Sequence, residues 1–289
     1  MRKTGPVDIV VPRDLTEAVE LTARGGRPLA GGTDMFVRLR KEMADPPFLV
    51  YVGELDSLRV VRATPAGVEV GAAVTHAELL AAPEITAFPI LASALATIGG
   101  PAIRAMGTLG GNLANASPAG DGLVPLYLLE ARVQLVGPGG ERELPVEDFI
   151  VAPGKTVLEH GELVSSIFLP YPEGEPRAYF RKVGRRRALV IAVASLGALI
   201  WLEDGRVERA RLALGSLAPT VLRPTQAERA LVGRPLTPEA MEPLGEMVSA
   251  ATQPISDLRA SADYRRRVAG QLLVDMALTL AGASPAQTG

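Results

Sequence analysis

The chain has 289 residues, 47% hydrophobic and 21% charged, which is the composition of an ordinary globular protein with a buried core. Its 30 basic and 32 acidic side chains give a formal charge of −2, so neither nucleic acid nor an anionic membrane surface is an expected partner. The sequence has no cysteine and only two histidines, His76 and His160. This excludes disulfides, cysteine-held iron–sulfur clusters and histidine cages, and no metal site is predicted.

No segment of the sequence is typical of export or membrane insertion. The apolar stretch at 7–11 is shorter than a signal-peptide core of about 7–15 residues. The longest uncharged run, between Arg187 and Glu203, is shorter than the roughly 18 residues of a membrane span and is rich in β-branched residues. We therefore expect a buried strand there, no membrane span, and a soluble cytoplasmic protein.

Strands and helices alternate in the first part of the chain, which predicts a small parallel sheet in an N-terminal α/β lobe at 1–54. Asp14 followed by Glu17 is typical of a helix start, and Asp34 after Gly31-Gly32 is expected to cap a second helix that ends at Glu42. The expected strands lie at 8–11, 28–30 and 48–52, and the helices at 15–24 and 35–42.

The pattern changes to antiparallel hairpins and helices in the second lobe, which we place at 55–174. Turn residues at 64–67 and 137–140 each separate two apolar runs and predict two hairpins. Helices are expected at 75–80, 87–98 and 123–131, a glycine-dense loop at 99–122, and a strand at 163–169.

A proline-rich stretch at 171–176 precedes the C-terminal domain, which we place at 175–282 and which is followed by a tail at 283–289. Three strands at 178–183, 189–202 and 207–214 predict a meander, with a turn at 203–205. Three helices follow, opened by Thr225 with Glu228 as a capping box, by Thr237 with Pro238, and by Ser261. The fold class is therefore α+β.

Common catalytic and nucleotide motifs are missing from the sequence. There is no Gly-x-Gly-x-x-Gly, no His-Glu-x-x-His and no Gly-x-Ser-x-Gly. Gly154-Lys155-Thr156 lacks the first glycine of a phosphate-binding loop, because position 149 is Phe149, and is interpreted as a polar turn. The run 185–187 is interpreted as a solvated turn, with phosphate binding as the alternative. No residue is predicted to be catalytic.

Two glycine loops, at 29–34 and 107–112, are the informative segments. Glycine lets main-chain N–H groups approach an anion closely, and a following helix adds a positive partial charge. Such a nest can hold phosphate oxygens without a lysine, and Thr33, Thr108 and Asn112 add side-chain donors. Two such loops predict a shared diphosphate site with Asp121 as acceptor for ribose hydroxyls. Tight turns and helix caps are the alternatives for each loop taken alone.

The two loops belong to longer motifs that resemble a known family. Ala30-Gly31-Gly32-Thr33-Asp34, Ile103-Arg104 followed by Gly107-Thr108-Leu109-Gly110-Gly111-Asn112, and the stretch through Asp121 resemble the FAD-binding medium subunit of molybdenum hydroxylases. This family includes xanthine dehydrogenases and aerobic carbon monoxide dehydrogenases. Residues 181–188 and the last helices resemble its C-terminal domain, so the resemblance covers nearly the whole chain.

The resemblance implies FAD as the cofactor and a two-lobed FAD-binding module, a small α/β lobe plus a larger α/β lobe, with a C-terminal domain of three antiparallel strands and helices. It places the diphosphate on both loops, Asp121 toward the adenosine half, Val164 near the flavin, and Lys182 in contact with the cofactor. The chain departs from the family at Ile98, where some members have an aromatic residue, and at Val190, where many have Asp. The implied FAD contacts are Pro28, Leu29, Ala30, Gly31, Gly32, Thr33, Asp34, Met35, Thr108, Leu109, Gly110, Gly111, Asn112, Asp121, Val164 and Lys182.

The resemblance also implies an electron-transfer role. A large molybdenum subunit would hydroxylate the substrate, a small iron–sulfur subunit would pass on the electrons, and FAD here would deliver them to NAD or another acceptor. The expected assembly is a dimer of heterotrimers. The absence of cysteine agrees with clusters held on another chain. The alternatives are a free-standing flavin oxidoreductase and a non-flavin structural subunit that retains the fold.

Overall fold

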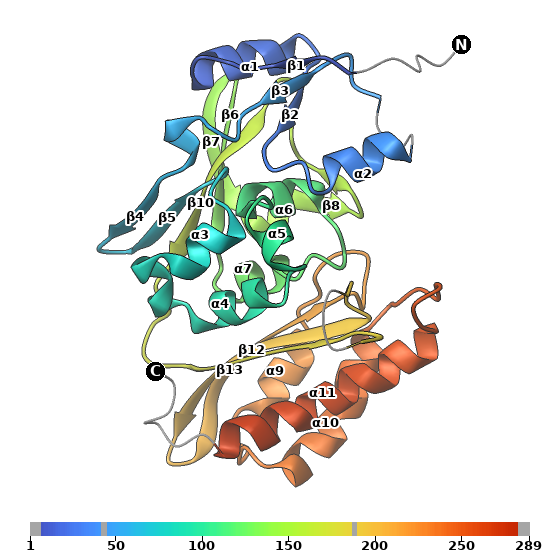
Figure 1. Ribbon diagram of the computed structural model, residues 1–289. Helices are drawn as coiled ribbons and strands as arrows, with labels where there is room; N and C mark the ends of the chain where they lie inside the picture. Colours follow the sequence, from blue (N-terminus) through green and yellow to red (C-terminus); the bar gives the residue numbers. More distant parts are fainter. Residues whose placement is uncertain (1–6, 42–44, 187–189, 283–289) are drawn as a thin grey trace.

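Three sheets of three or more strands follow one another along the described part of the chain, and β8 and β9 form a separate two-stranded sheet (Figure 1). The computed structural model describes residues 7–41, 45–186 and 190–282. Figure 1 shows the N-terminal sheet at the top, the middle sheet in the centre and the C-terminal sheet at the bottom. This is the mixed helix-and-sheet fold that the sequence predicts.

The N-terminal sheet has the order β1-β3-β2 with both pairs parallel, as predicted. Helix α1 begins after Asp14, whose carboxylate accepts from the Glu17 N–H at 2.8 Å, which confirms the predicted cap. The lobe shares its core with later segments, because Leu58 and Leu163 pack into it. The bounds are β1 Ile9–Val10, α1 Leu15–Ala23, β2 Arg27–Leu29, α2 Met35–Arg40 and β3 Leu49–Tyr51.

The prediction that Asp34 caps the second helix is wrong. Helix α2 does begin at Met35, but Asp34 has helical backbone angles (φ −99°, ψ −41°) and its side chain makes no cap hydrogen bond. An N-cap residue needs an extended backbone for its side chain to reach back to the helix N–H groups. The expected helix end at Glu42 lies outside the described residues.

The middle sheet is antiparallel in the order β4-β5-β10-β6-β7, and both predicted hairpins are present. Gly154, with φ +69°, lies in the turn between β8 and β9, which confirms the interpretation of 154–156 as a turn. The strands are β4 Val61–Thr64, β5 Gly67–Gly71, β6 Arg132–Gly137, β7 Gly140–Pro145, β8 Ile150–Ala152, β9 Lys155–Thr156 and β10 Leu163–Pro170. The helices are η1 Asp56–Leu58, α3 His76–Ala81, η2 Pro83–Ala87, α4 Pro89–Ala96, α5 Pro101–Arg104, α6 Leu109–Asn115, α7 Leu123–Leu128 and α8 Val146–Phe149.

The prediction of a continuous loop over 99–122 is wrong, because α5 and α6 lie within it. Helix α6 is capped by Thr108 Oγ1, which accepts from the Gly111 N–H at 2.9 Å. Gly110 is needed for packing, since a Cβ there would lie 2.5 Å from the Cβ of Ala72. Gly110 therefore marks a close approach between α6 and the residue that follows β5, and the short helix tolerates its glycines because its cap and packing compensate.

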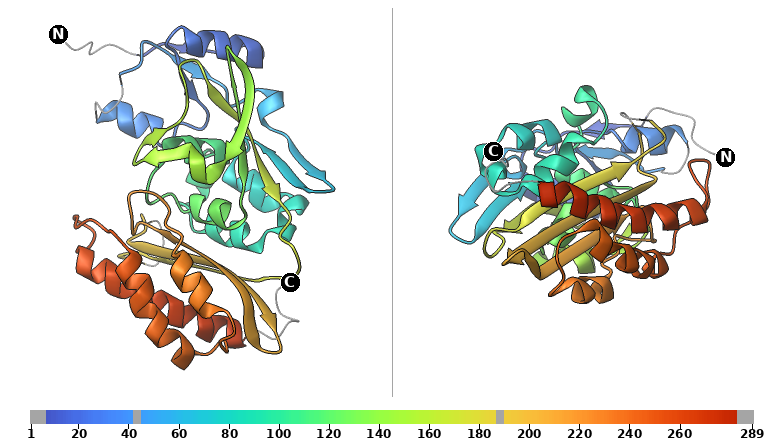
Figure 2. Two further views of the ribbon diagram at one scale, coloured as in Figure 1. Left: turned by 180° about the vertical axis from the view of Figure 1, so that it is seen from behind. Right: turned by 90° about the horizontal axis from the view of Figure 1, so that it is seen from below.

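The C-terminal sheet, in the order β11-β12-β13, is covered by helices on both faces (Figure 2). Leu196, Ala198 and Ile200 of β12 face the core formed with α9, α10 and α11. Leu199 and Trp201, which alternate with them, face the core of the middle lobe, where α4 and α7 pack. The bounds are β11 Arg177–Val183, β12 Ala194–Glu203, β13 Arg206–Gly215, α9 Thr225–Leu231, α10 Pro238–Ala251 and α11 Ala262–Gly282.

The sequence predicts capped starts for two helices of the C-terminal domain, and one of these predictions is wrong. Thr237 accepts from the Ala240 N–H with Pro238 at the first position, as expected. The Thr225–Glu228 capping box does not form, because α9 starts after Pro224 and Glu228 instead accepts from the Leu212 N–H and pairs with Arg223.

Within the described ranges, no helix is both long and apolar enough to span a bilayer. The predicted tail at 283–289, Arg187 of the arginine run and Leu189 at the predicted start of β12 lie outside the described residues.

Candidate functional site

The two glycine loops meet directly. The first loop follows β2 and leads into α2, and the second leads from α5 into α6. A Cβ on Gly31 would lie 1.6 Å from the main-chain oxygen of Met106 and 3.1 Å from the nitrogen of Gly107. Only glycine allows this approach. The structure thus brings Gly31 and the start of the second loop together, as a shared site requires.

The first loop presents main-chain N–H groups. Among the described residues, no protein acceptor is found for the N–H groups of residues 31–35, while the Gly32 carbonyl accepts from Phe36 at 3.0 Å. Gly32 has φ +70°, a conformation that favours glycine. A run of N–H groups at a turn next to a helix start is a suitable site for an anion.

The second loop is built differently. The N–H groups of Leu109, Gly110 and Asn112 donate to the carbonyls of Val74, Ala72 and Thr108, and that of Gly111 to Thr108 Oγ1. These groups are already paired within the chain, so the second loop offers the Thr108 hydroxyl, the Asn112 side chain and the space above Gly111. A Cβ on Gly111 would approach only Thr108 Oγ1, at 2.9 Å.

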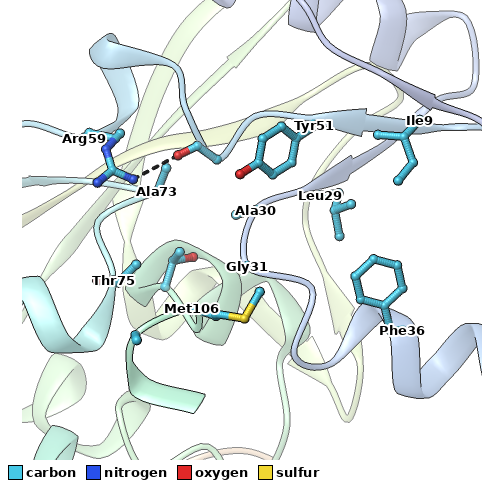
Figure 3. Close-up of a pocket in the computed structure, with 13 residues that line it drawn as sticks. Ile9, Leu29, Ala30, Gly31, Phe36, Tyr51, Arg59, Ala73, Thr75 and Met106 are labelled. Atoms are coloured by element: carbon cyan, nitrogen blue, oxygen red, sulfur yellow. Dashed lines mark hydrogen bonds between the residues drawn. The ribbon is translucent and has the colours of Figure 1, made fainter. Parts of the chain in front are cut away.

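A cavity of about 390 Å³ lies between the loops (Figure 3). Leu29, Ala30 and Gly31 line one side, and Met106 lies next to Gly31. Figure 3 shows the rings of Tyr51 and Phe36 on the side of the N-terminal lobe and Arg59 at the far end, where it donates to the Gly53 carbonyl. The remaining lining residues are Ile9, Ala73, Thr75, Ala105 and Thr108.

Two arginines give the first loop a positive environment. Arg38 on α2 donates to Asn115 Oδ1 on α6 at 3.2 Å and so connects the two loop-bearing helices. Burial, together with the charge of Arg38, lowers the pKa of Arg27. Burial raises the pKa of Asp34, and the nearby Arg38 partly opposes this shift. Positive charge beside the free N–H groups favours an anionic ligand there.

A buried ion pair joins β11 to the segment between α6 and α7. Lys182 Nζ on β11 is 2.6 Å from Asp121 Oδ2, and the two side chains are 7% and 6% exposed. Burial raises the pKa of Asp121, and the Lys182 ammonium opposes that shift. Asp121 Oδ1 and Asn112 Oδ1 are buried without any hydrogen-bond partner. Buried polar atoms are nearly always paired, so these two acceptors indicate a ligand that brings donors.

Val164, Ile98, Val190, Pro28, Thr33 and Met35, which the sequence analysis also singles out, lie at the following places. Val164 is buried on β10 beside a bulge, where the neighbouring Ser165 carbonyl accepts from Ala72 N–H, and Ala72 in turn accepts from Gly110. Ile98 is half-buried in the turn after α4. Val190 packs against Gly184, where a Cβ would lie 2.2 Å from Val190 Cγ1. Pro28 lies on β2, and Thr33 and Met35 lie in and just after the first loop.

Sequence reasoning missed several lining residues, among them Phe36, Tyr51, Arg59, Thr75 and Met106. Thr75 bridges to Thr108 across the chain, a long-range pairing that carries no local sequence signal. Met106 stands inside the quoted motif, immediately before the second loop, and could have been found there. Among the described residues, no cluster of His, Cys, Asp or Glu is suited to a metal ion.

Comparison with family models decides which family this is. Residues 5–172 match the FAD binding domain in molybdopterin dehydrogenase, and residues 178–280 match the CO dehydrogenase flavoprotein C-terminal domain. The chain belongs to this FAD-binding family. FAD is therefore its cofactor, and the chain is an FAD-binding subunit of the molybdenum hydroxylases, a group of oxidoreductases. The predicted family, cofactor and fold are confirmed.

Individual relatives of the family are similar over most of their length. The carbon monoxide dehydrogenase medium chain of Hydrogenophaga pseudoflava is 31% identical over 267 residues, 91% of this chain and 92% of that protein. The putative xanthine dehydrogenase FAD-binding subunit of Escherichia coli K12 is 33% identical over 257 residues, 87% of this chain and 88% of that protein. The solved CO dehydrogenase from Oligotropha carboxidovorans superimposes with a TM-score of 0.89 at 31% identity, covering 94% of this chain and 96% of that chain.

The residues present fit an FAD. The unpaired N–H groups of the first loop suit a diphosphate, and the unpaired acceptors on Asn112 and Asp121 suit hydroxyl or ring N–H donors. Four residues of a helix rise about 6 Å, so Thr108 and Asn112 are close enough to contact the same bound molecule.

Proposed function

We propose that FAD lies along α6, with its diphosphate between the two glycine loops and its flavin ring toward Lys182. The contacts would be made by residues 28–35, by 108–112, and by Asp121, Val164 and Lys182. Because Asp121 is 2.6 Å from Lys182, we propose that both contact the flavin end of FAD, in place of the adenosine half that the resemblance implies for Asp121. The chain would be organised as a FAD-binding lobe at 1–54, a second lobe at 55–174 and a C-terminal domain at 175–282.

The contact of Gly31 with Met106 is the observation that carries this proposal. It joins the run of unpaired N–H groups to the second loop. A diphosphate placed there would be held by neutral main-chain donors and the Thr108 hydroxyl, with Arg27 and Arg38 adding positive charge nearby. The unpaired acceptors on Asn112, in the first turn of α6, and on Asp121, in the segment after α6, support a ligand that extends from the loops to the ion pair.

The bound FAD would supply the redox chemistry, and the protein would hold and tune it. The Lys182 ammonium would stabilise negative charge on the ring, and its pairing with Asp121 would keep that charge in place. No acid–base group of the chain is required by this role. Lobes on both sides of the site would exclude water from most of the cofactor.

We propose that the electrons come from iron–sulfur clusters on a small partner subunit, after hydroxylation on a large molybdenum subunit, and pass to NAD or another acceptor. The names of relatives as medium chains of carbon monoxide dehydrogenases support three subunits. We further propose a dimer of such heterotrimers in the cytoplasm.

Replacement of Gly111 tests the site. A Gly111→Trp side chain would fill the space above the second loop, where a Cβ meets only Thr108 Oγ1, and we expect at least a tenfold loss of FAD affinity. FAD content per chain is measured from the visible absorbance of purified protein and from titration of the apoprotein. Stoichiometric FAD in this variant would contradict the assigned site.

Gly139→Trp is the matched control. Gly139 lies in the β6–β7 turn, and a Cβ there meets no atom within 4 Å. We expect this variant to bind FAD like the natural chain. Loss of FAD in both variants would indicate a general effect of the tryptophan and would leave Gly111 without a specific role.

The acceptor is tested with NADH. If NAD accepts electrons from this chain, NADH should reduce the bound flavin and bleach its visible absorbance. Dithionite serves as the control reductant. A flavin that dithionite reduces and NADH does not would reject NAD as the acceptor while leaving the FAD site intact.

A further inference from the structure

Four consecutive main-chain carbonyls, at the end of α4, accept hydrogen bonds from side-chain cations. Arg104 Nη1 lies 3.3, 3.0 and 3.1 Å from the carbonyl oxygens of Ala96, Ile98 and Gly99. The carbonyl between them, that of Thr97, accepts from Lys182 Nζ at 3.1 Å. Arg104 ends α5 and Lys182 lies on β11, so the turn at 96–99 connects two distant segments.

Arg104 is what fixes this turn beyond the end of the helix. The N–H groups of Thr97 and Ile98 bond back to α4, and Gly99 has φ +48°. Carbonyls at a helix C-terminus carry partial negative charge and are stabilised by cations. Because Arg104 holds the carbonyls on both sides of Thr97, it fixes the direction of the Thr97 carbonyl as well.

The Thr97 carbonyl in turn fixes the Lys182 ammonium. An ammonium has three N–H donors. One donates to Asp121 Oδ2 at 2.6 Å and another to Thr97 O at 3.1 Å. Because two of its N–H groups donate to fixed acceptors, the direction of the third N–H is fixed as well. If Thr97 were free to move, the ammonium could rotate about its bond to Asp121.

We propose that Arg104 is a positioning residue that, through the Thr97 carbonyl, sets the place of the Lys182 charge beside the flavin and so raises the reduction potential of FAD. This rests on the proposed function of the site. Arg104 also stands one turn before the second glycine loop, where Gly107 N–H donates to Ile103 O at 2.7 Å. One short segment therefore arranges both the diphosphate loop and the charge at the ring.

The test is a double-mutant cycle on the full chain carrying FAD. Arg104→Met, Lys182→Met and the double variant are compared for the flavin reduction potential, measured by equilibration with a reference dye. We expect Arg104→Met to shift the potential in the negative direction by at least half the shift of Lys182→Met. In the Lys182→Met background the Arg104 change should add nothing, because the charge it positions is gone. An unchanged potential in Arg104→Met, or fully additive shifts, would overturn the proposal.

Arg206→Met is the matched control, since Arg206 also donates to a carbonyl, that of Gly233, but far from the site. Its potential should equal that of the natural chain. A crystal structure of Arg104→Met provides a readout that needs no FAD: Lys182 Nζ should leave hydrogen-bond distance of Thr97 O. Retention of that bond would overturn the proposal. A colourless natural chain would instead contradict the proposed function itself.

Discussion

His76 lies directly beneath the second glycine loop. Its N–H donates to the Gly107 carbonyl at 2.9 Å, and its ring packs where a Cβ on Gly107 would be 3.2 Å from Cδ2. The side chain is 3% exposed and Nδ1 has no hydrogen-bond partner. Burial, aided by the charge of Arg104, lowers the pKa of His76 to about 4. The ring is therefore neutral at physiological pH.

This burial predicts a loss of stability in mild acid. The unfolded chain takes up a proton at His76 near pH 6.5 and the folded chain only near pH 4, so the free energy of unfolding falls as the pH falls through this window. Between pH 7.5 and pH 5 the loss should be about 2 kcal/mol. Urea unfolding of His76→Phe should lack this loss. His160→Phe, which replaces the other histidine, should retain it, and an equal effect of both variants would contradict the explanation.

At the scale of elements, two acidic residues stand before the first two helices and behave differently. Asp14 has an extended backbone and caps α1, whereas Asp34 has a helical backbone and makes no cap bond. An acidic residue before a helix start is common to both, so the residue type alone does not predict the backbone conformation that decides whether a cap forms.

The contrast predicts unequal effects of alanine. In the apoprotein Asp14→Ala should lower the free energy of unfolding by about 1 kcal/mol, the usual cost of a lost N-cap. Asp34→Ala loses no cap bond and removes a carboxyl whose pKa burial raises, so it should cost less. Denaturant midpoints of both variants check this. An Asp34→Ala effect as large as that of Asp14→Ala would indicate a stabilising role that the helix geometry does not provide.

Elements with local signals were predictable, and those that depend on distant contacts were not. The hairpins with Thr64-Pro65-Ala66-Gly67 and Gly137-Pro138-Gly139-Gly140 follow from turn residues alone. Helix α6 did not, because Gly110 is needed for a close approach to Ala72, which is distant in the sequence. In the site, motif residues such as Gly31 and Asn112 were identified, whereas Tyr51 and Arg59 reach the cavity through the fold and carry no motif.

At the scale of the molecule, the C-terminal sheet rests on the helices of the middle lobe. Gly197 on β12 is a point of close approach, since a Cβ there would lie 2.7 Å from Val124 Cγ1 and 2.8 Å from Leu128 Cδ1 on α7. Lys182 on β11 reaches Asp121 only while the sheet keeps this position, and Ser195, paired with Lys182, is two residues from Gly197.

Enlarging Gly197 should therefore weaken FAD binding from a distance. Gly197→Val forces β12 away from α7 and lengthens the Lys182–Asp121 contact, and we expect at least a fivefold loss of FAD affinity together with a lower thermal midpoint. Titration of apoprotein with FAD measures it. Gly139→Val, with open space around it, should change neither quantity. An unchanged FAD affinity in Gly197→Val would show that FAD binding does not depend on the position of the C-terminal sheet against α7.

The burial of β12 on both faces has a practical consequence for expressing the part of this chain before residue 175 on its own. Alternate side chains of β12 belong to the core of the middle lobe and to the core of the C-terminal domain. Truncation after residue 174 would therefore expose Val124, Leu128 and the apolar surface around them. A fragment trimmed in this way would tend to aggregate. Fusion or display designs should therefore keep the strands at 177–215 and the helices that cover their outer side.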